Sequence, residues 1–164
     1  MRTIVEQATA SAAYHRVRER LIHGAGGVTY FVHSREPSFR EDGIFGSAAM
    51  VTAVTALNQQ VRSLAPVLNS ATLPNVVAVT SSNSAAPIDM MTKAKGQVLY
   101  IFAAIARAGT TTGTFAIAGL TGDGSASVAG ESRAVPIVAG KLIDDFAASA
   151  VHIYQIDLGA ITCR

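Results

Sequence analysis

Three side chains in the first half of the chain could take part in acid–base chemistry. His33 directly follows the apolar stretch Val28–Val32, and Glu36 and Glu41 lie in the polar segment after it. Two carboxyl groups held at a fixed separation can serve as proton donor and as base or nucleophile. A loop holds such groups less precisely than helices or strands do. Glu36 and Glu41 are therefore weak catalytic candidates, and the alternative is a solvated loop.

Other motifs that could carry chemistry have a simpler structural interpretation. The glycine-rich segment Gly24–Gly27 stands between an expected helix and an expected strand, whereas phosphate loops follow a strand and open a helix. Asp144 and Asp145 are neighbours, so in an extended chain they point to opposite faces and cannot share a metal or a proton. Cys163 is the only cysteine, which excludes an internal disulfide and any multi-cysteine metal site. We expect neither a metal nor a cofactor.

The composition indicates a globular protein with a real core. Of 164 residues, 49% are apolar and 15% are charged, and the formal net charge is +2. This near balance of charge argues against nucleic acid as a partner. Apolar runs such as Val98–Ile105 are too short for a membrane-spanning helix, so we expect a soluble protein without a membrane partner. Glu6 and Gln7 interrupt the start of the chain, so no signal peptide is predicted and the compartment stays open.

The elements that position these groups differ between the two halves of the chain. In the first half, apolar residues at helical spacing predict a helix over Val5–Leu21, which Gly24 ends. The β-branched and aromatic stretch Val28–Val32 predicts a buried strand. A second helix is predicted after Ser47, which can cap it, and Pro66 is expected to forbid its continuation.

The second half changes to short apolar runs separated by glycine and polar residues, which is typical of an antiparallel sandwich. Six strands are predicted: Asn75–Thr80, Gln97–Ile105, Thr114–Ala118, Ser125–Ala129, Ala134–Val138 and Ala150–Asp157. Pro136 is expected to make its run an edge strand or a bulge. His152 and Tyr154 alternate with Val151 and Ile153, so one of these pairs should face the core.

Three blocks of sequence then resemble one known family. Leu21–His33, Ala53–Asn58 and Leu64–Ser70 resemble the closing strand and helix of a cellulase-like glycoside-hydrolase TIM barrel, and Gly140–Tyr154 resembles the last strands of the small β-sandwich that follows that barrel. The likeness covers most of the chain, from about residue 15 to residue 157. It implies an α+β fold, with two helices and one barrel-type strand over residues 1–70 and an antiparallel β-sandwich over residues 71–164.

The resemblance also implies a function and its limits. Family members hydrolyse β-glycosidic bonds with two carboxylates on the fourth and seventh barrel strands, and by this alignment both positions would lie upstream of Met1. We therefore expect a C-terminal fragment of a glycoside hydrolase-like protein without a complete catalytic site, in which His33 is a weak candidate for sugar contact.

Two alternatives stay open, and each implies a carbohydrate partner. Oligomerisation could assemble a cleft around His33, Glu36 and Glu41 and give weak glycosidase activity, or the sandwich could bind a polysaccharide or oligosaccharide. A lone strand over Val28–Val32 would leave backbone groups unpaired, so a homo-oligomer is also expected.

Overall fold

The computed structural model describes residues 17, 20–25, 27–28, 30, 32–33, 38–105 and 107–161. The chain divides into two compact units, Met1–Ala65 and Pro66–Arg164. We call them the N-terminal unit and the sheet unit and describe each by itself. Among the described residues, no helix combines the length and apolar character that a membrane-spanning helix requires.

In the N-terminal unit, the end of the first predicted helix is confirmed. The described helical residues end at Ile22, and the next turn closes with two backbone hydrogen bonds. The Gly24 N–H donates to the Leu21 carbonyl at 3.1 Å, and the Ala25 N–H donates to the Arg20 carbonyl at 3.0 Å. This bond pair, with Gly24 at a φ of 80°, is the usual glycine-terminated helix end.

The predicted buried strand over Val28–Val32 is not borne out. Of this stretch the structure describes Val28, Tyr30 and Val32. Tyr30 forms an isolated β-bridge, but none of the three belongs to a strand. The Tyr30 hydroxyl instead donates to the Asn58 side-chain oxygen at 2.8 Å. A β-branched run has strand propensity but forms a strand only where a neighbouring strand supplies hydrogen bonds. The expected barrel-type strand is therefore not found among the described residues of this stretch, and the self-association argued from it stays a prediction.

The second helix begins where the sequence predicts. The one-turn 3-10 helix η1 (Gly43–Gly46) precedes α2 (Ala48–Leu68), and the Ser47 hydroxyl accepts the Met50 N–H at 3.3 Å as an N-cap. The predicted end was wrong, because Pro66 lies inside α2. A proline this close to the C-terminus removes one hydrogen bond of the last turns, and the helix continues to Leu68.

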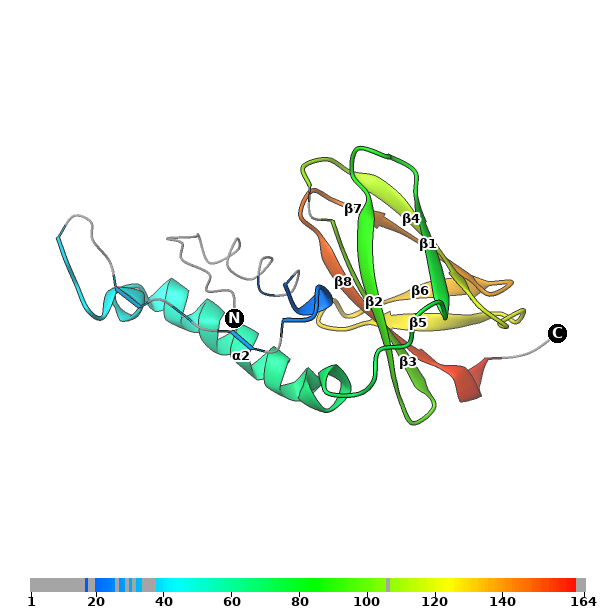
Figure 1. Cartoon of the computed structure of the whole chain (residues 1–164), viewed down its shortest axis with the longest axis horizontal. Helices are drawn as coiled ribbons and strands as arrows, with labels where there is room; N and C mark the ends of the chain where they lie inside the picture. Colours follow the sequence, from blue (N-terminus) through cyan, green and yellow to red (C-terminus); the bar gives the residue numbers. More distant parts are fainter. Residues whose placement is uncertain are drawn as a thin grey trace. The chain divides into compact units, whose positions relative to one another are not determined.

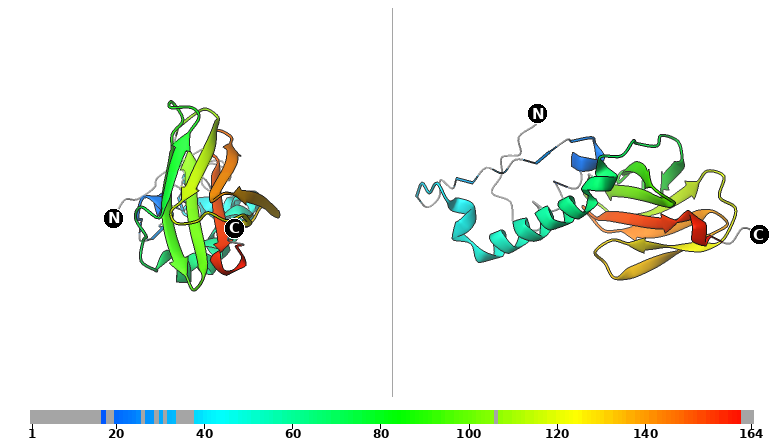
Figure 2. Two further views of the ribbon diagram at one scale, coloured as in Figure 1. Left: turned by 90° about the vertical axis from the view of Figure 1, so that its right-hand side faces the viewer. Right: turned by 90° about the horizontal axis from the view of Figure 1, so that it is seen from below.

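The sheet unit is a single antiparallel sheet that nearly closes on itself (Figure 1). The predicted antiparallel arrangement is confirmed, but the expected β-sandwich is not, because all the strands belong to this one sheet. Its strands are β1 (Val77–Ser81), β2 (Ile88–Lys95), β3 (Val98–Ile105), β4 (Thr111–Ile117), β5 (Gly124–Val128), β6 (Arg133–Val138), β7 (Lys141–Phe146) and β8 (Val151–Asp157). They lie in the order β1-β4-β7-β6-β5-β8-β3-β2, and every neighbouring pair is antiparallel. The terminal strands β1 and β2 approach each other, and the Ile88 N–H donates to the Ser81 hydroxyl at 2.9 Å (Figure 2).

All six predicted strands overlap observed strands, but β2 and β7 were missed. In the middle of β2, Met91, Thr92 and Lys93 are all buried. The strand therefore lacks the alternation of apolar and polar residues that marks a half-exposed strand. In β7 the apolar run is broken by two acidic residues, one of which, Asp144, lies on the inner face of the sheet. Both strands break the simple polarity pattern that predicts a strand.

Pro136 does not mark an edge strand, because β6 lies between β5 and β7. It pairs with Ser125 of β5, whereas the β6–β7 ladder contains only the pairs of Ile137 and Val138. Pro136 therefore lies beyond the part of β6 that pairs with β7, where its missing N–H is tolerated.

The core of the sheet unit consists of inward-facing residues from all eight strands. The largest fully buried side chains are Tyr154, Phe115, Phe146, Leu99, Ile101, Ile137, Leu142 and Ile156. The Phe115 ring centroid lies 5.4 Å from that of Tyr154 and 6.1 Å from that of Phe146. His152 and Tyr154 are the pair of β8 that faces inward, although Val151 and Ile153 on the opposite face are also buried.

A short connection fastens the end of α2 to β2. The Leu73 N–H donates to the Thr92 carbonyl at 2.9 Å, and the Thr92 hydroxyl donates back to the Leu73 carbonyl. The buried Lys93 ammonium donates to the Ser70 carbonyl at 2.6 Å, just beyond the helix C-terminus, where a cation is favourable. The burial of this lysine is thus offset by a hydrogen bond and by the helix dipole.

Candidate functional site

The residues predicted from the sequence for sugar chemistry lie in the N-terminal unit. His33 is exposed, and its ring stacks on the exposed ring of Phe39, with centroids 5.7 Å apart and planes at 16°. Glu41 is exposed on the turn before η1. Glu36 lies outside the described residues. A catalytic pair of Glu36 and Glu41 and a sugar contact by His33 therefore stay predictions.

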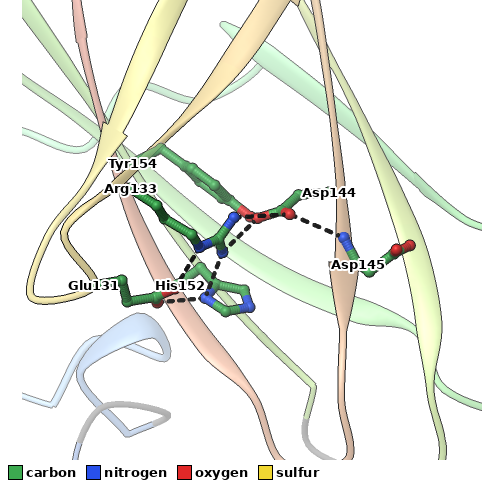
Figure 3. Close-up of polar contacts among 6 residues, drawn as sticks. All are labelled: Glu131, Arg133, Asp144, Asp145, His152 and Tyr154. Atoms are coloured by element: carbon green, nitrogen blue, oxygen red, sulfur yellow. Dashed lines mark hydrogen bonds and ion pairs between the residues drawn. The ribbon is translucent and has the colours of Figure 1, made fainter.

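The sheet unit instead brings together five polar side chains that we call the Arg133 cluster. Its members are Glu131, Arg133, Asp144, His152 and Tyr154 (Figure 3). Glu131 lies on the turn between β5 and β6, and the others extend from β6, β7 and β8. These strands follow one another in the chain, but β8 is separated from β6 by β5 in the sheet, so the folded sheet is needed to bring the five side chains together.

Arg133 and Asp144 form the centre of this cluster through a bidentate ion pair. The two terminal guanidinium nitrogens donate to the two carboxylate oxygens at 3.0 and 2.8 Å. The Tyr154 hydroxyl donates to Asp144 Oδ2 at 2.8 Å, and the Asp145 N–H donates to Asp144 Oδ1 at 3.0 Å. Each oxygen of Asp144 thus accepts two hydrogen bonds, which satisfies a carboxylate that is only 13% exposed.

Asp145 takes no part in this ion pair. Its side chain points away from the cluster in Figure 3 and accepts a hydrogen bond from the Thr112 hydroxyl at 2.7 Å. The prediction that Asp144 and Asp145 face opposite sides is confirmed. The described residues contain no group of three or more His, Cys, Asp and Glu side chains that could hold a metal ion.

Glu131 joins Arg133 to His152. One carboxylate oxygen lies 2.7 Å from Arg133 Nε, and the other lies 2.5 Å from His152 Nδ1. The same Nδ1 lies 3.3 Å from an Arg133 nitrogen, but an imidazole nitrogen cannot donate and accept at once. We assign the hydrogen to Nδ1 on the shorter contact, because an ionised carboxylate can only accept. The His152 ring also meets the Phe146 ring edge-on, with centroids 4.6 Å apart.

The cluster shifts the pKa values of four of its members, Glu131, Arg133, Asp144 and Tyr154. Burial alone raises the pKa of Glu131, but hydrogen bonds from His152 and Arg133 outweigh it and hold that pKa below its ordinary value. Burial likewise raises the pKa of Asp144, but hydrogen bonds from Arg133 and Tyr154 outweigh it and hold that pKa below its ordinary value. The hydrogen bond to Asp144 raises the pKa of Arg133, and burial raises that of Tyr154. Both carboxyl groups are therefore ionised, and the phenol is neutral.

This charge pattern suits structural cohesion better than catalysis. A general acid needs a carboxyl group whose pKa is raised toward the working pH, and a nucleophile needs an oxygen free to attack. Glu131 and Asp144 have lowered pKa values, and their oxygens are engaged by cations and donors. The arrangement ties β6, β7, β8 and the β5–β6 turn together.

Sequence reasoning noticed only part of this cluster. Asp144, His152 and Tyr154 were singled out, but Glu131 and Arg133 were not. The available signal was a pair of opposite charges two residues apart, at the turn where a strand begins. That signal does not indicate which residues Glu131 and Arg133 contact.

Comparison with known proteins gives no relative for this chain. It matches no protein-family model, no curated protein and no solved structure.

Proposed function

We propose that the chain is an accessory, non-catalytic part of a carbohydrate-active, glycoside hydrolase-like protein, and that the sheet unit corresponds to the β-sandwich of that family. The non-catalytic role is supported by the charge state of two carboxylates. In the described sheet unit, these are the carboxylates that lie together in one polar cluster. Glu131 and Asp144 are both held ionised around one guanidinium. The carbohydrate connection is supported by the sequence resemblance.

A polysaccharide-binding role has less support from the surface of the sheet unit. Its large, exposed apolar side chains among the described residues are Val138, Ile143 and Leu158. None is aromatic, and sugar-binding platforms use exposed aromatic rings to stack on the sugar face. Among the described Phe and Tyr residues of the sheet unit, only Tyr100 is half-buried, and the others are buried.

The proposal is tested by activity and stability measured on the same variants. Asp144→Asn removes a charge-assisted pair and should lower the free energy of unfolding by about 2 kcal/mol. Asp145→Asn is the matched control, since an amide oxygen can still accept from Thr112, and should cost less than about 0.5 kcal/mol. Urea unfolding followed by circular dichroism measures both.

Hydrolysis of aryl β-glycosides should stay at background for the wild-type chain and for every variant. Turnover that disappears in Asp144→Asn or Glu131→Gln, while the folded fraction is unchanged, would overturn the non-catalytic role. Turnover that disappears in Glu41→Gln would instead favour a glycosidase site in the N-terminal unit. Cosedimentation with insoluble cellulose or xylan tests the binding alternative.

A further inference from the structure

The outer face of β7 carries a short pattern of unlike charges around an apolar residue. Lys141, Ile143 and Asp145 alternate on this strand and are all exposed, and Ile143 retains 56% of its accessible surface. Val138 on neighbouring β6 pairs with Lys141 and is 62% exposed. Val138 and Ile143 are the two most exposed large apolar side chains in the described sheet unit.

On the neighbouring strands β4 and β6, the side chains of this surface are short and uncharged. Thr112, Thr114 and Ala116 of β4 pair with Asp145, Ile143 and Lys141, and Val138 is the exposed residue of β6 that pairs with β7. We call these residues together with Lys141, Ile143 and Asp145 the β7 face. It contains no aromatic ring for a sugar and only one cation for a phosphate backbone. Its short side chains allow a second flat protein surface to approach closely.

The charges of the β7 face are complementary to those of a copy of itself. Lys141 and Asp145 are four residues apart, so they lie about 13 Å apart on either side of Ile143. A two-fold axis in the interface plane, passing Ile143 and running perpendicular to β7, reverses the strand direction. It sets Lys141 of one copy opposite Asp145 of the other, twice, and Ile143 against Ile143. Among the described residues, the Lys141 ammonium makes no hydrogen bond or ion pair, and Asp145 is held in place by Thr112.

We propose that the β7 face binds a second copy of this chain across that two-fold axis, an inference that goes beyond the proposed function and does not depend on it. β7, the paired part of β4 and the short paired part of β6 give a surface at most about 15 Å wide and 20 Å long. This is less than half of the roughly 800 Å² per partner that stable complexes bury. The dimer is therefore weak and forms in a concentration-dependent manner.

Sedimentation equilibrium of the full chain up to about 0.5 mM protein tests the dimer, because this range detects dissociation constants in the micromolar to millimolar range. Lys141→Asp places aspartates opposite aspartates, and Asp145→Lys places lysines opposite lysines. Each should weaken the dimer about tenfold or more, and the double variant Lys141→Asp/Asp145→Lys should restore it. Ile143→Glu should abolish it. Lys95→Asp, a charge reversal at an exposed end of β2, is the matched control and should have no effect.

Each outcome decides the proposal. A chain that is monomeric at every concentration overturns it. A dimer that Ile143→Glu and both single charge reversals leave unchanged uses another surface and also overturns it. A dimer weakened by the single reversals but not restored by the double variant overturns the proposed axis. Circular dichroism confirms that each variant is folded.

Discussion

At the scale of single residues, the Arg133 cluster shows how a polar group is accommodated inside a small sheet. Asp144 is tolerated on the inner face because Arg133, Tyr154 and a backbone N–H supply four hydrogen bonds to its two oxygens. A half-satisfied network would cost more than an apolar replacement. The cluster therefore stabilises the fold only as a complete set.

The lowered pKa values of Glu131 and Asp144 predict how stability depends on pH. Their ordinary values are 4.5 and 3.8, and the folded values lie below these. A depressed folded pKa contributes stability above the ordinary value and loses it as the pH falls through the folded one. The free energy of unfolding contributed by this pair should stay constant from pH 7 to about 5 and fall below it.

Urea unfolding between pH 7 and pH 3 measures this dependence. The double variant Glu131→Gln/Asp144→Asn should be less stable at pH 7 and should lose less on acidification, because it lacks both titrating groups. Parallel curves for the two proteins would contradict the assignment.

At the scale of elements, local signals determine the ends of helices better than they determine strands. The Ser47 cap and the Gly24 turn each act through hydrogen bonds to backbone groups within five residues, so they could be predicted directly. β2 and β7 depend on partners elsewhere in the chain. The buried Lys93 needs the Ser70 carbonyl, and Asp144 needs Arg133, so their polarity conceals the strands that carry them.

The turn between β6 and β7 gives a prediction at this scale. Gly140 has a φ of 71°, and a Cβ built there would lie 1.8 Å from the Leu120 carbonyl oxygen. Gly96, in the turn between β2 and β3, has a φ of 61°, but its Cβ would meet nothing within 4 Å. Gly140→Ala should therefore destabilise by about 3 kcal/mol or more, and Gly96→Ala by about 1 kcal/mol. Thermal and urea unfolding of the two variants check this difference, and equal losses would contradict it.

At the scale of the whole molecule, the sheet unit carries a core of its own. The buried core cluster and the residues packed on it lie between Leu73 and Ile161, entirely within this unit. Hydrophobic burial is the main source of folding free energy. Residues 66–164 expressed alone should therefore fold, with a cooperative urea transition and the circular dichroism spectrum of a β protein. A fragment that unfolds without cooperativity would show that the N-terminal unit is required.

The sequence alone determined the α+β class, the antiparallel character of the second half, two helix termini and the opposite directions of Asp144 and Asp145. These features follow from periodicity and from hydrogen bonds between near neighbours, which need no knowledge of distant residues. Only the tertiary structure decided the strand order, the absence of Val28, Tyr30 and Val32 from the described strands, and the assembly of Glu131, Arg133, Asp144, His152 and Tyr154. Strand pairing and buried ion pairs join residues far apart in the chain, and a polar residue gives no indication of its partner until the sheet has closed.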